Sequence, residues 1–273
     1  MSDILHKILA TKRGEVAAAK ARLPQAEIEA LATGGPVPRD FVGAIRAKRA
    51  AGKPAVIAEI KQASPSAGVF RAGLAGAASK FDPARFAQSY EAHGAACLSV
   101  LTDKNYFQGS DEHLIDARNA TSLPVLRKDF IVDPYQIFEA RAIGADAVLF
   151  IMGAAPIAQF VEWELLAQSL GLAVLAESHH ETEIQQALML KTCLIGVNNR
   201  DLTRFTTDIQ TTIRLMRHVP PDRILVTESG ISNAAIVAEM SAFGVSAYLI
   251  GGALMQSVEP GVALAALFSD RLW

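Results

Sequence analysis

A regular alternation of strand-like and helix-like segments after Pro54 constrains the fold of this chain more than any other feature. This alternation is typical of βα units that build a parallel sheet. We predict eight strands, at residues 55–60, 96–101, 124–127, 146–151, 173–177, 193–198, 223–227 and 247–250. We predict helices after them at 83–93, 110–120, 134–143, 156–170, 181–190, 208–217, 232–243 and 259–268.

Glycine and proline positions favour closure of these units into a barrel. Four glycines separate a predicted helix from the next strand, as left-handed helix ends often require: Gly94, Gly144, Gly171 and Gly244. Three prolines suit the first turn of a helix: Pro83, Pro134 and Pro156. An open doubly wound sheet uses similar units, but its glycine fingerprint is missing. We therefore predict an α/β fold of the (β/α)8 TIM-barrel type.

The length of the chain suits one such barrel. Its 273 residues and 51% hydrophobic content support one large core, and an α/β barrel commonly uses about 250 residues as a single domain. We predict one TIM-barrel domain over residues 1–273. Residues 1–50 form a helical extension packed on the barrel, with helices at 3–22, 25–32 and 39–50.

Composition narrows the expected partners and compartment. A formal net charge of −2 gives no reason to expect nucleic acid or an anionic membrane as partner. No run reaches the roughly 20 apolar residues of a membrane helix, and the first residues carry an amphipathic pattern instead of an export signal. Cys97 and Cys193 lack metal or redox spacing and are interpreted as buried free thiols. We expect a cytoplasmic protein that is a monomer or a weak homo-oligomer.

Polar residues stand where several predicted strands end. Glu59 and Lys61 alternate at the end of the first strand, so both point to one side. Lys128 ends the third strand, Glu177 the fifth and Asn198 the sixth. A parallel barrel gathers these ends at one mouth, where such barrels carry their active sites. Lysines and glutamates that meet there suit acid/base chemistry, and a structural ion-pair network is the alternative.

Two glycine-containing tracts predict a phosphate site. Residues 227–230 precede a predicted helix, and residues 249–254 repeat the design one unit later. Glycines let a phosphate approach the backbone, and the loops after strands seven and eight are the frequent phosphate site of these barrels. A plain tight turn explains either tract alone, but the pair in consecutive units favours phosphate.

Two other patterns carry less weight. His179 and His180 stand near Glu177 and Glu183, but without established metal-ligand spacing, so we interpret them as structural or solvent-facing. Ser229 has no histidine partner indicated by the sequence, and serine catalysis lacks support. No metal site and no cofactor is expected.

Several tracts together resemble the indole-3-glycerol phosphate synthase family of tryptophan biosynthesis. They are AEIKQASPS at 58–66, residues 101–103 with 106–110, KDFIVDPYQ at 128–136, residues 176–177, GVNNRDL at 196–202, residues 228–231 and LIGGALM at 249–255. The likeness covers nearly the whole chain, including the amino-terminal helices.

The resemblance implies a carboxy-lyase, a carbon-carbon lyase that closes the ring of 1-(2-carboxyphenylamino)-1-deoxyribulose 5-phosphate with loss of carbon dioxide and water. It implies no cofactor or metal. Lys128 resembles the general acid that protonates the substrate carbonyl. Glu177 and Glu59 resemble acid/base groups for later proton removal and dehydration, and Lys61 resembles a substrate contact and second acid.

The resemblance also implies the binding residues. Asn198 and Arg200 resemble the groups that orient the substrate hydroxyls and carboxylate. The apolar walls around its aromatic ring correspond to Phe107, Phe130, Leu149 and Leu202. The phosphate cradle corresponds to Ser229, Gly230, Gly251 and Gly252, with help from Lys61 and Ser64. An apolar slot with cations at both anionic ends of the substrate would align it for ring closure.

Two departures and two alternatives remain. Gly252 stands where the family often has a serine, and the stretch 72–80 is longer than usual. Phosphoribosylanthranilate isomerase shares a phosphate-binding barrel but is expected to use a cysteine and an aspartate instead of these lysines and glutamates. A noncatalytic phosphate-ligand binding protein would tolerate loss of Lys128 or Glu177, and both are present.

Overall fold

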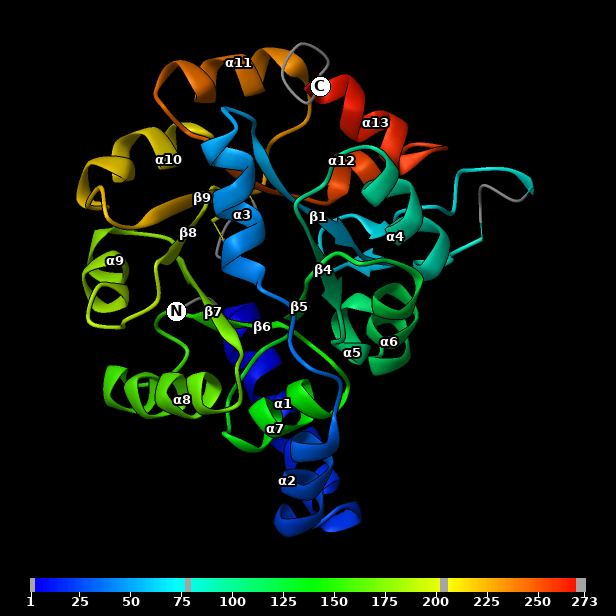
Figure 1. Cartoon of the computed structure of the whole chain (residues 1–273), viewed down its shortest axis with the longest axis vertical. Helices are drawn as coiled ribbons and strands as arrows, with labels where there is room; N and C mark the ends of the chain where they lie inside the picture. Colours follow the sequence, from blue (N-terminus) through cyan, green and yellow to red (C-terminus); the bar gives the residue numbers. More distant parts are fainter. Residues whose placement is uncertain (1–2, 77–79, 202–205, 269–273) are drawn as a thin grey trace.

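Eight short apolar runs form a closed barrel of parallel strands with helices around it (Figure 1). The computed structural model describes residues 3–76, 80–201 and 206–268. The barrel strands are β1 (Ala55–Ile60), β4 (Cys97–Leu101), β5 (Val125–Lys128), β6 (Ala147–Ile151), β7 (Ala173–Ser178), β8 (Leu194–Asn198), β9 (Ile224–Glu228) and β10 (Ala247–Ile250). Each begins and ends within one residue of its predicted bounds, so the predicted TIM-barrel fold is confirmed.

The barrel closes where its last strand pairs with its first. Neighbours follow chain order from β1 and β4 round to β10, and β10 pairs with β1 from Ala55↔Ala247 to Ala58↔Ile250. Because every pairing is parallel, all carboxyl ends lie on one rim. We call this rim, with the loops that follow Ile60, Lys128 and the other strand ends, the mouth.

Helices follow the strands and cover the outside of the barrel (Figure 1). They are α4 (Pro83–Ala92), α6 (Asp111–Ala120), α7 (Tyr135–Ala142), α8 (Ile157–Ser169), α9 (Glu181–Ala187), α10 (Gln210–Leu215), α11 (Ala234–Ala242) and α13 (Pro260–Leu267). A 3-10 turn, Met216–His218, extends α10. The predicted order of strands and helices is therefore observed.

Local chemistry explains where these helices begin and end. Asp82, Ser110 and Asn233 cap α4, α6 and α11 by accepting a hydrogen bond from a backbone N–H three residues on. The four predicted helix-ending glycines all have positive φ, between 75° and 88°: Gly94, Gly144, Gly171 and Gly244. Pro83 occupies the first turn as predicted. The first-turn prediction is wrong for Pro134 and Pro156, which are N-cap residues one position earlier.

Short elements that the sequence pattern did not predict enlarge the mouth. The loop after β1 contains an antiparallel hairpin, β2 (Ala63–Ser64) with β3 (Gly68–Val69). One-turn helices α5 (Lys104–Phe107) and α12 (Gly252–Met255) follow β4 and β10. The stretch 72–80, predicted to be unusually long, lies partly outside the described residues.

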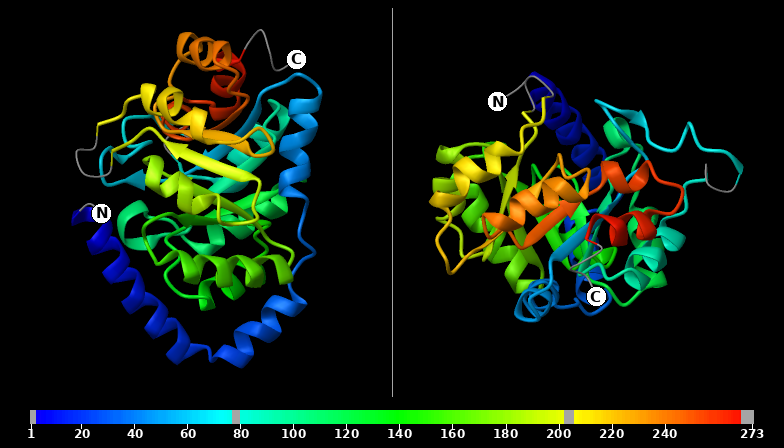
Figure 2. Two further views of the ribbon diagram at one scale, coloured as in Figure 1. Left: turned by 90° about the vertical axis from the view of Figure 1, so that its left-hand side faces the viewer. Right: turned by 90° about the horizontal axis from the view of Figure 1, so that it is seen from above.

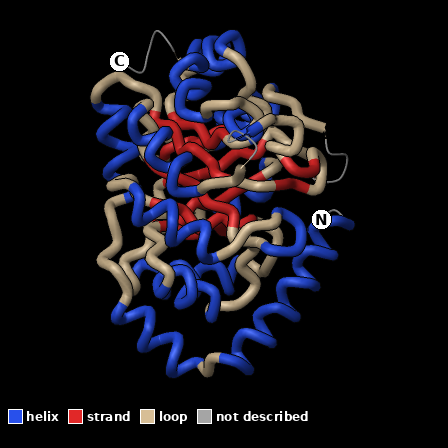
Figure 3. Tube along the Cα trace, turned by 90° about the vertical axis from the view of Figure 1, so that its right-hand side faces the viewer, coloured by secondary structure: helices blue, strands red, loops and turns tan. Residues whose placement is uncertain are grey.

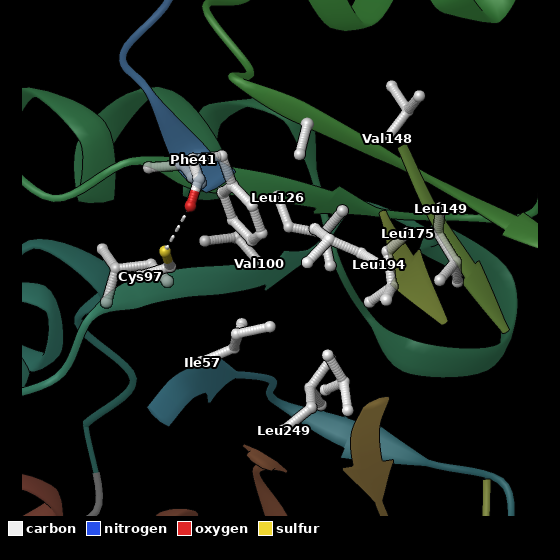
Figure 4. Packing of buried hydrophobic residues seen from close by; sticks show 14 of the residues in the cluster. Phe41, Ile57, Cys97, Val100, Leu126, Val148, Leu149, Leu175, Leu194 and Leu249 are labelled. Carbon is white, nitrogen blue, oxygen red and sulfur yellow. Dashed lines mark hydrogen bonds between the residues drawn. The ribbon is translucent and has the colours of Figure 1, made fainter. Parts of the chain in front are cut away.

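The interior of the barrel is filled by aliphatic side chains. Figure 4 shows Ile57, Leu126, Leu175, Leu194 and Leu249 converging from five strands, and each is at most 4% exposed. A filled interior leaves no channel through the barrel. Chemistry is therefore confined to the mouth.

The two cysteines are in different environments. Cys97 in β4 is buried, and its thiol donates a hydrogen bond to the carbonyl of Phe41 at 3.5 Å (Figure 4). Burial raises the pKa of the Cys97 thiol. Cys193 lies one residue before β8 and is only partly buried, so the prediction of two buried thiols is wrong for Cys193. Both thiols are free.

The amino-terminal extension forms three helices, α1 (Asp3–Arg22), α2 (Gln25–Gly34) and α3 (Phe41–Ala50). Helices α1 and α2 form a V against one side of the barrel (Figures 2 and 3). Val16 of α1 and Ile28 of α2 pack on Tyr135 of α7. The first turns of α1 lie on the mouth side, whereas α3 lies at the opposite end of the barrel (Figure 2). Within the ranges given above, no helix is long and apolar enough to cross a membrane.

Candidate active site

The mouth contains a cavity of about 500 Å³ that brings the predicted site residues together. Those that line it are Glu59, Lys61, Ser64, Phe107, Phe130, Lys128, Leu149, Glu177, Asn198, Arg200, Ser229, Gly230, Gly251 and Gly252. The remaining predicted site residue, Leu202, lies outside the described residues. Groups from all eight barrel strands or the loops after them therefore share one space.

Lys128 lies at the centre of the polar part of this cavity. Its Nζ donates hydrogen bonds to Glu177 Oε2 at 2.7 Å and to Glu228 Oε2 at 2.8 Å. Burial lowers the pKa of a lysine, but here the charges of Glu177, Glu228 and Glu59 outweigh burial and the pKa of Lys128 is raised. The side chain is therefore an ammonium at neutral pH.

The two carboxylates share this one ammonium unequally. For Glu177, burial is outweighed by Lys128, by His179 and by a hydrogen bond from Asn198, so its pKa is lowered. For Glu228, burial and the negative charge of Glu177 outweigh Lys128, so its pKa is raised. The pair titrates as a unit, with one member ionised and the other holding a proton more tightly. Environments that separate two pKa values in this way are typical of acid/base sites.

Glu228 is a site residue that the sequence prediction missed. It ends β9 opposite Asn198 in the pairing with β8, so its side chain enters the same mouth. The signal was present, since a glutamate at a strand end had already drawn attention to Glu177. The sequence prediction assigns the tract 227–230 to a phosphate loop alone.

Glu59 and Lys61 form a second pair across the mouth. Lys61 Nζ lies 2.5 Å from Glu59 Oε1, as the alternation along β1 predicted. The same ammonium lies over the ring of Phe70, 5.2 Å from its centroid. A side chain at Gly251 would collide with Glu59, because its Cβ would lie 2.2 Å from Oε1. Gly251 therefore provides the space that Glu59 occupies.

Asn198 and Arg200 connect the carboxylates to the rim. Asn198 Nδ2 donates to Glu177 Oε1 at 2.9 Å, and Asn198 Oδ1 accepts from the backbone N–H of Arg200 at 3.0 Å. Arg200 Nη1 donates to Ser66 Oγ at 3.3 Å, which links the loops after β8 and β1. The Arg200 guanidinium thus lies at the entrance to the cavity.

The loops after β9 and β10 form a glycine-lined corner. Ser229 and Gly230 have left-handed backbones, with φ of 65° and 82°. A Cβ at Gly230 would lie 2.8 Å from Thr207, so neither the backbone nor the space permits a side chain there. At Gly252 a Cβ would meet only Phe70, at 3.6 Å, which is an ordinary contact.

An apolar wall faces these polar groups. The rings of Phe107 and Phe130 are 6.0 Å apart at 38°, and Leu149 lies beside them in the cavity lining. Helix α1 adds three residues that the sequence does not place in the site: Ile4, Leu5 and Ile8. Their amphipathic spacing was visible in the sequence, but nothing there indicated which surface they cover.

A buried ion cluster holds α1 over the mouth. Lys12 is only 4% exposed, and its Nζ lies 2.9 Å from both Asp103 and Asp129. Burial opposes the charge of Lys12, but the two aspartates outweigh burial and its pKa is raised. Thr102 Oγ1 donates to the other oxygen of Asp129 at 2.5 Å. Since Asp129 directly follows Lys128, one cluster ties the helix to the strand end that carries the central lysine.

The adjacent histidines have separate environments. His180 caps α9 by accepting the backbone N–H of Glu183 at 3.4 Å, and its side chain is 62% exposed. The His179 side chain is 16% exposed and lies near Glu177. A solvent-facing interpretation is therefore wrong for His179. Within the described part of the chain, no group of three His, Cys, Asp or Glu residues is arranged to hold a metal ion.

Comparison with known proteins agrees with this geometry. The family model for indole-3-glycerol phosphate synthase matches residues 5–267. A protein of that name from Acidithiobacillus ferrooxidans is 55% identical over 99% of this chain and 100% of its own length. One from Burkholderia vietnamiensis is 56% identical over 98% of this chain and 100% of its own length.

Solved structures with the same fold are more distant in sequence. A mutant tryptophan synthase alpha-subunit from Pyrococcus furiosus superposes with a TM-score of 0.59 at 14% identity. The match covers 80% of this chain and 99% of that one, and it shows the barrel fold alone. The family match and the curated relatives carry the assignment further: this chain belongs to the indole-3-glycerol phosphate synthase family.

Proposed function

We propose how the mouth of this barrel carries out the reaction of its family, which yields a small phosphorylated product. The substrate is 1-(2-carboxyphenylamino)-1-deoxyribulose 5-phosphate, and the protein is a carboxy-lyase of tryptophan biosynthesis. The observation that carries the proposal is the Lys128 ammonium, buried between Glu177 and Glu228 below an apolar wall.

Lys128 assists formation of the new carbon–carbon bond. The aromatic carbon that bears the carboxylate attacks the carbonyl carbon of the sugar chain, and negative charge develops on the carbonyl oxygen. A fixed ammonium in a low-dielectric cavity stabilises that charge without reorganisation. It then donates its proton, because the alkoxide is a stronger base than the amine. Departure of carbon dioxide restores an electron pair to the ring system.

The remaining steps remove a proton and a hydroxyl group. Glu177, held as a carboxylate, takes the proton that leaves as the indole forms. Glu228 holds its own proton more tightly, which leaves Lys128 with one full countercharge instead of two. Glu59 and Lys61 form a second acid/base pair at the mouth for departure of the hydroxyl group as water.

The rest of the cavity holds the substrate for these steps. Phe107, Phe130 and Leu149 contact the aniline ring, and Leu202 belongs to the same set by resemblance. Asn198 and Arg200 orient the hydroxyl groups and the carboxylate. The phosphate is bound by Ser229, Gly230, Gly251 and Gly252, with Lys61 and Ser64 from the loop after β1. A pocket that holds the two reacting carbons in alignment lowers the entropic part of the activation free energy.

The cavity favours this function over the alternatives. A purely structural ion network gains nothing from facing an open space of about 500 Å³ with an aromatic wall. A binding protein needs no pair of glutamates with separated pKa values around a lysine. The two free cysteines lie in β4 and just before β8, and neither lines the cavity, which argues against cysteine-dependent isomerase chemistry.

We further propose that residues 1–273 act as one domain in the cytoplasm, as a monomer or weak homo-oligomer. Support for one unit comes from α1, which supplies Ile4, Leu5 and Ile8 to the cavity and is held there by Lys12.

Conversion of the substrate by purified protein tests this function. Indole fluorescence should appear on mixing with the carboxyphenylamino-deoxyribulose phosphate, and it should appear equally with a metal chelator present. The same compound without its phosphate should react poorly. A folded protein that binds the substrate and produces no indole would refute the proposal.

A further inference from the structure

The carboxylate of Glu177 has a third neighbour besides Lys128 and Asn198. Its Oε2 accepts from Lys128, and its Oε1 accepts from Asn198. The same Oε1 faces His179 Nε2 at 3.4 Å. The proposed mechanism uses the ammonium and the amide, and it leaves this imidazole without a role.

The local sequence explains why His179 reaches Glu177. Strand β7 ends at Ser178, and side chains alternate along a strand, so residues 177 and 179 point to the same side while 178 points away. Only His179 and His180 separate β7 from α9. A connection this short fixes the backbone of His179 between two regular elements.

Glu183 fixes the orientation of the ring. Its Oε2 accepts the backbone N–H of His179 at 2.6 Å and lies 3.1 Å from Nδ1. Its Oε1 lies 3.3 Å from His180 Nε2 and only 2.9 Å from where a Cβ on Gly153 would be. A carboxylate at Nδ1 places a proton on that nitrogen, which turns Nε2 toward Glu177.

The environment of Nε2 favours the imidazolium. The Nε2 atom is buried and has no hydrogen-bond partner among the described residues. A neutral ring would leave the Nε2 lone pair next to a carboxylate, whereas an imidazolium places positive charge 3.4 Å from Glu177 Oε1. The charged groups around the ring are Glu177, Glu183 and Glu228, with Lys128 beyond Glu177 and His180 at its outer side. Burial lowers the pKa of His179, but these carboxylates outweigh burial and raise it.

We propose that His179 is a positioning residue for the family reaction: its imidazolium, oriented by Glu183, holds Glu177 ionised and in the rotamer that accepts the substrate proton. This inference rests on the proposed role of Glu177 as base. It assigns the pair His179 and Glu183 to the layer behind the reacting groups, where residues act on catalysis through the group they hold.

The pH dependence follows from the sign of the interaction. An imidazolium beside Glu177 lowers the pKa of that carboxyl, so removal of the imidazolium raises it and the acid limb of kcat/KM moves to higher pH. Ionisations of the substrate phosphate are the same for every variant. Only the difference between variants in the pH of the acid limb is therefore informative.

Three variants separate this role from a structural one. His179→Asn keeps a polar group near the position of Nδ1 but loses Nε2, the nitrogen that faces Glu177. We expect kcat to fall roughly tenfold, with KM within about twofold of the parent value. Its acid limb should move up by about half to one pH unit. His179→Gln returns an uncharged N–H donor near the Nε2 position, so kcat should recover to within about threefold while the limb stays displaced. His180→Asn preserves the N-cap of α9 and should match the parent protein.

Titration of the His179 ring by NMR gives a readout independent of turnover. Its pKa should lie above 6.5 in the parent protein and fall in both Glu177→Gln and Glu183→Gln. A folded His179→Asn protein with unchanged kcat and acid limb would overturn the inference, as would a ring pKa unaffected by Glu177→Gln. If the parent protein produces no indole fluorescence from the substrate, the proposed function fails instead. The NMR titration still decides whether His179 and Glu177 are coupled.

Discussion

At the scale of single residues, the central interaction is one ammonium shared by two buried carboxyl groups. Coulomb attraction in a buried site is strong, but a charge that loses its partner there is costly. Lys128 avoids that cost by contacting both Glu177 and Glu228. The same arrangement keeps it charged at neutral pH, so the residue that stabilises the resting site is also the one prepared to stabilise an oxyanion.

Removal of this ammonium should abolish turnover without unfolding the protein. In Lys128→Met we expect kcat to fall by roughly 10³-fold, because a charge that acts on the transition state is lost. The two carboxyls can relieve their repulsion by taking up protons. Steady-state kinetics and circular dichroism check both points. A folded variant with near-normal kcat would exclude Lys128 as the acid.

The two glutamates should respond differently to the same substitution. Glu177→Gln removes a group held as a carboxylate, and kcat should fall by roughly 10²-fold or more. Glu228→Gln resembles the protonated state that its environment already favours, so the loss should be several times smaller. Measured side by side, kcat values in the reverse order would show that the proton assignments are exchanged. Melting temperatures of both variants show whether a loss of stability, and not of a catalytic group, explains the lower kcat.

At the scale of elements, the loops after β9 and β10 differ in the room they leave for side chains. Gly252 has space for one, whereas Gly230 has a left-handed backbone and Thr207 close by. Gly252→Ser should add a hydroxyl contact to the phosphate and lower KM by roughly 2- to 10-fold. Gly230→Ser is the matched control and should raise KM. Equal effects of the two substitutions on KM would show that the phosphate does not bind in this corner.

Helix α1 is an element of the active site as well as of the fold. In Lys12→Met the two aspartates lose their ammonium, so α1 should loosen and kcat/KM should fall roughly tenfold or more. Limited proteolysis should then cut α1 faster while the barrel stays intact. Lys20 lies in the same helix, and Lys20→Met removes its exposed ion pair with Asp133, which is worth at most about 1 kcal/mol, and its contact with the Tyr135 ring, but leaves the buried cluster intact. If both variants behave alike, the buried cluster does not hold the helix.

At the scale of the whole molecule, the regular parts were predictable and the irregular parts were not. The barrel strands were predicted to within one residue because apolar runs repeat in every unit and glycine turns precede four of the strands. Helices α5 and α12 have four residues each, which is too short to form without tertiary contacts, and they left no periodic signal.

The same division holds for the candidate site. The residues at strand ends were found because a closed parallel barrel must bring them together. The wall from α1 was not found, since Lys12 and Asp129 are more than a hundred residues apart and no local pattern connects them. His179 was set aside because the sequence could not tell a buried ring from an exposed one.

The pairing of β1 with β10 has a consequence for how the enzyme is made. Ala55 finds its partner Ala247 only when nearly all of the chain has been synthesised. A nascent chain on the ribosome therefore exposes an unpaired edge of β1 until translation is almost complete, and such edges recruit other strands. Protection of that edge during translation would therefore determine the yield of active enzyme in a cell. A chaperone or slow elongation before β10 would provide it.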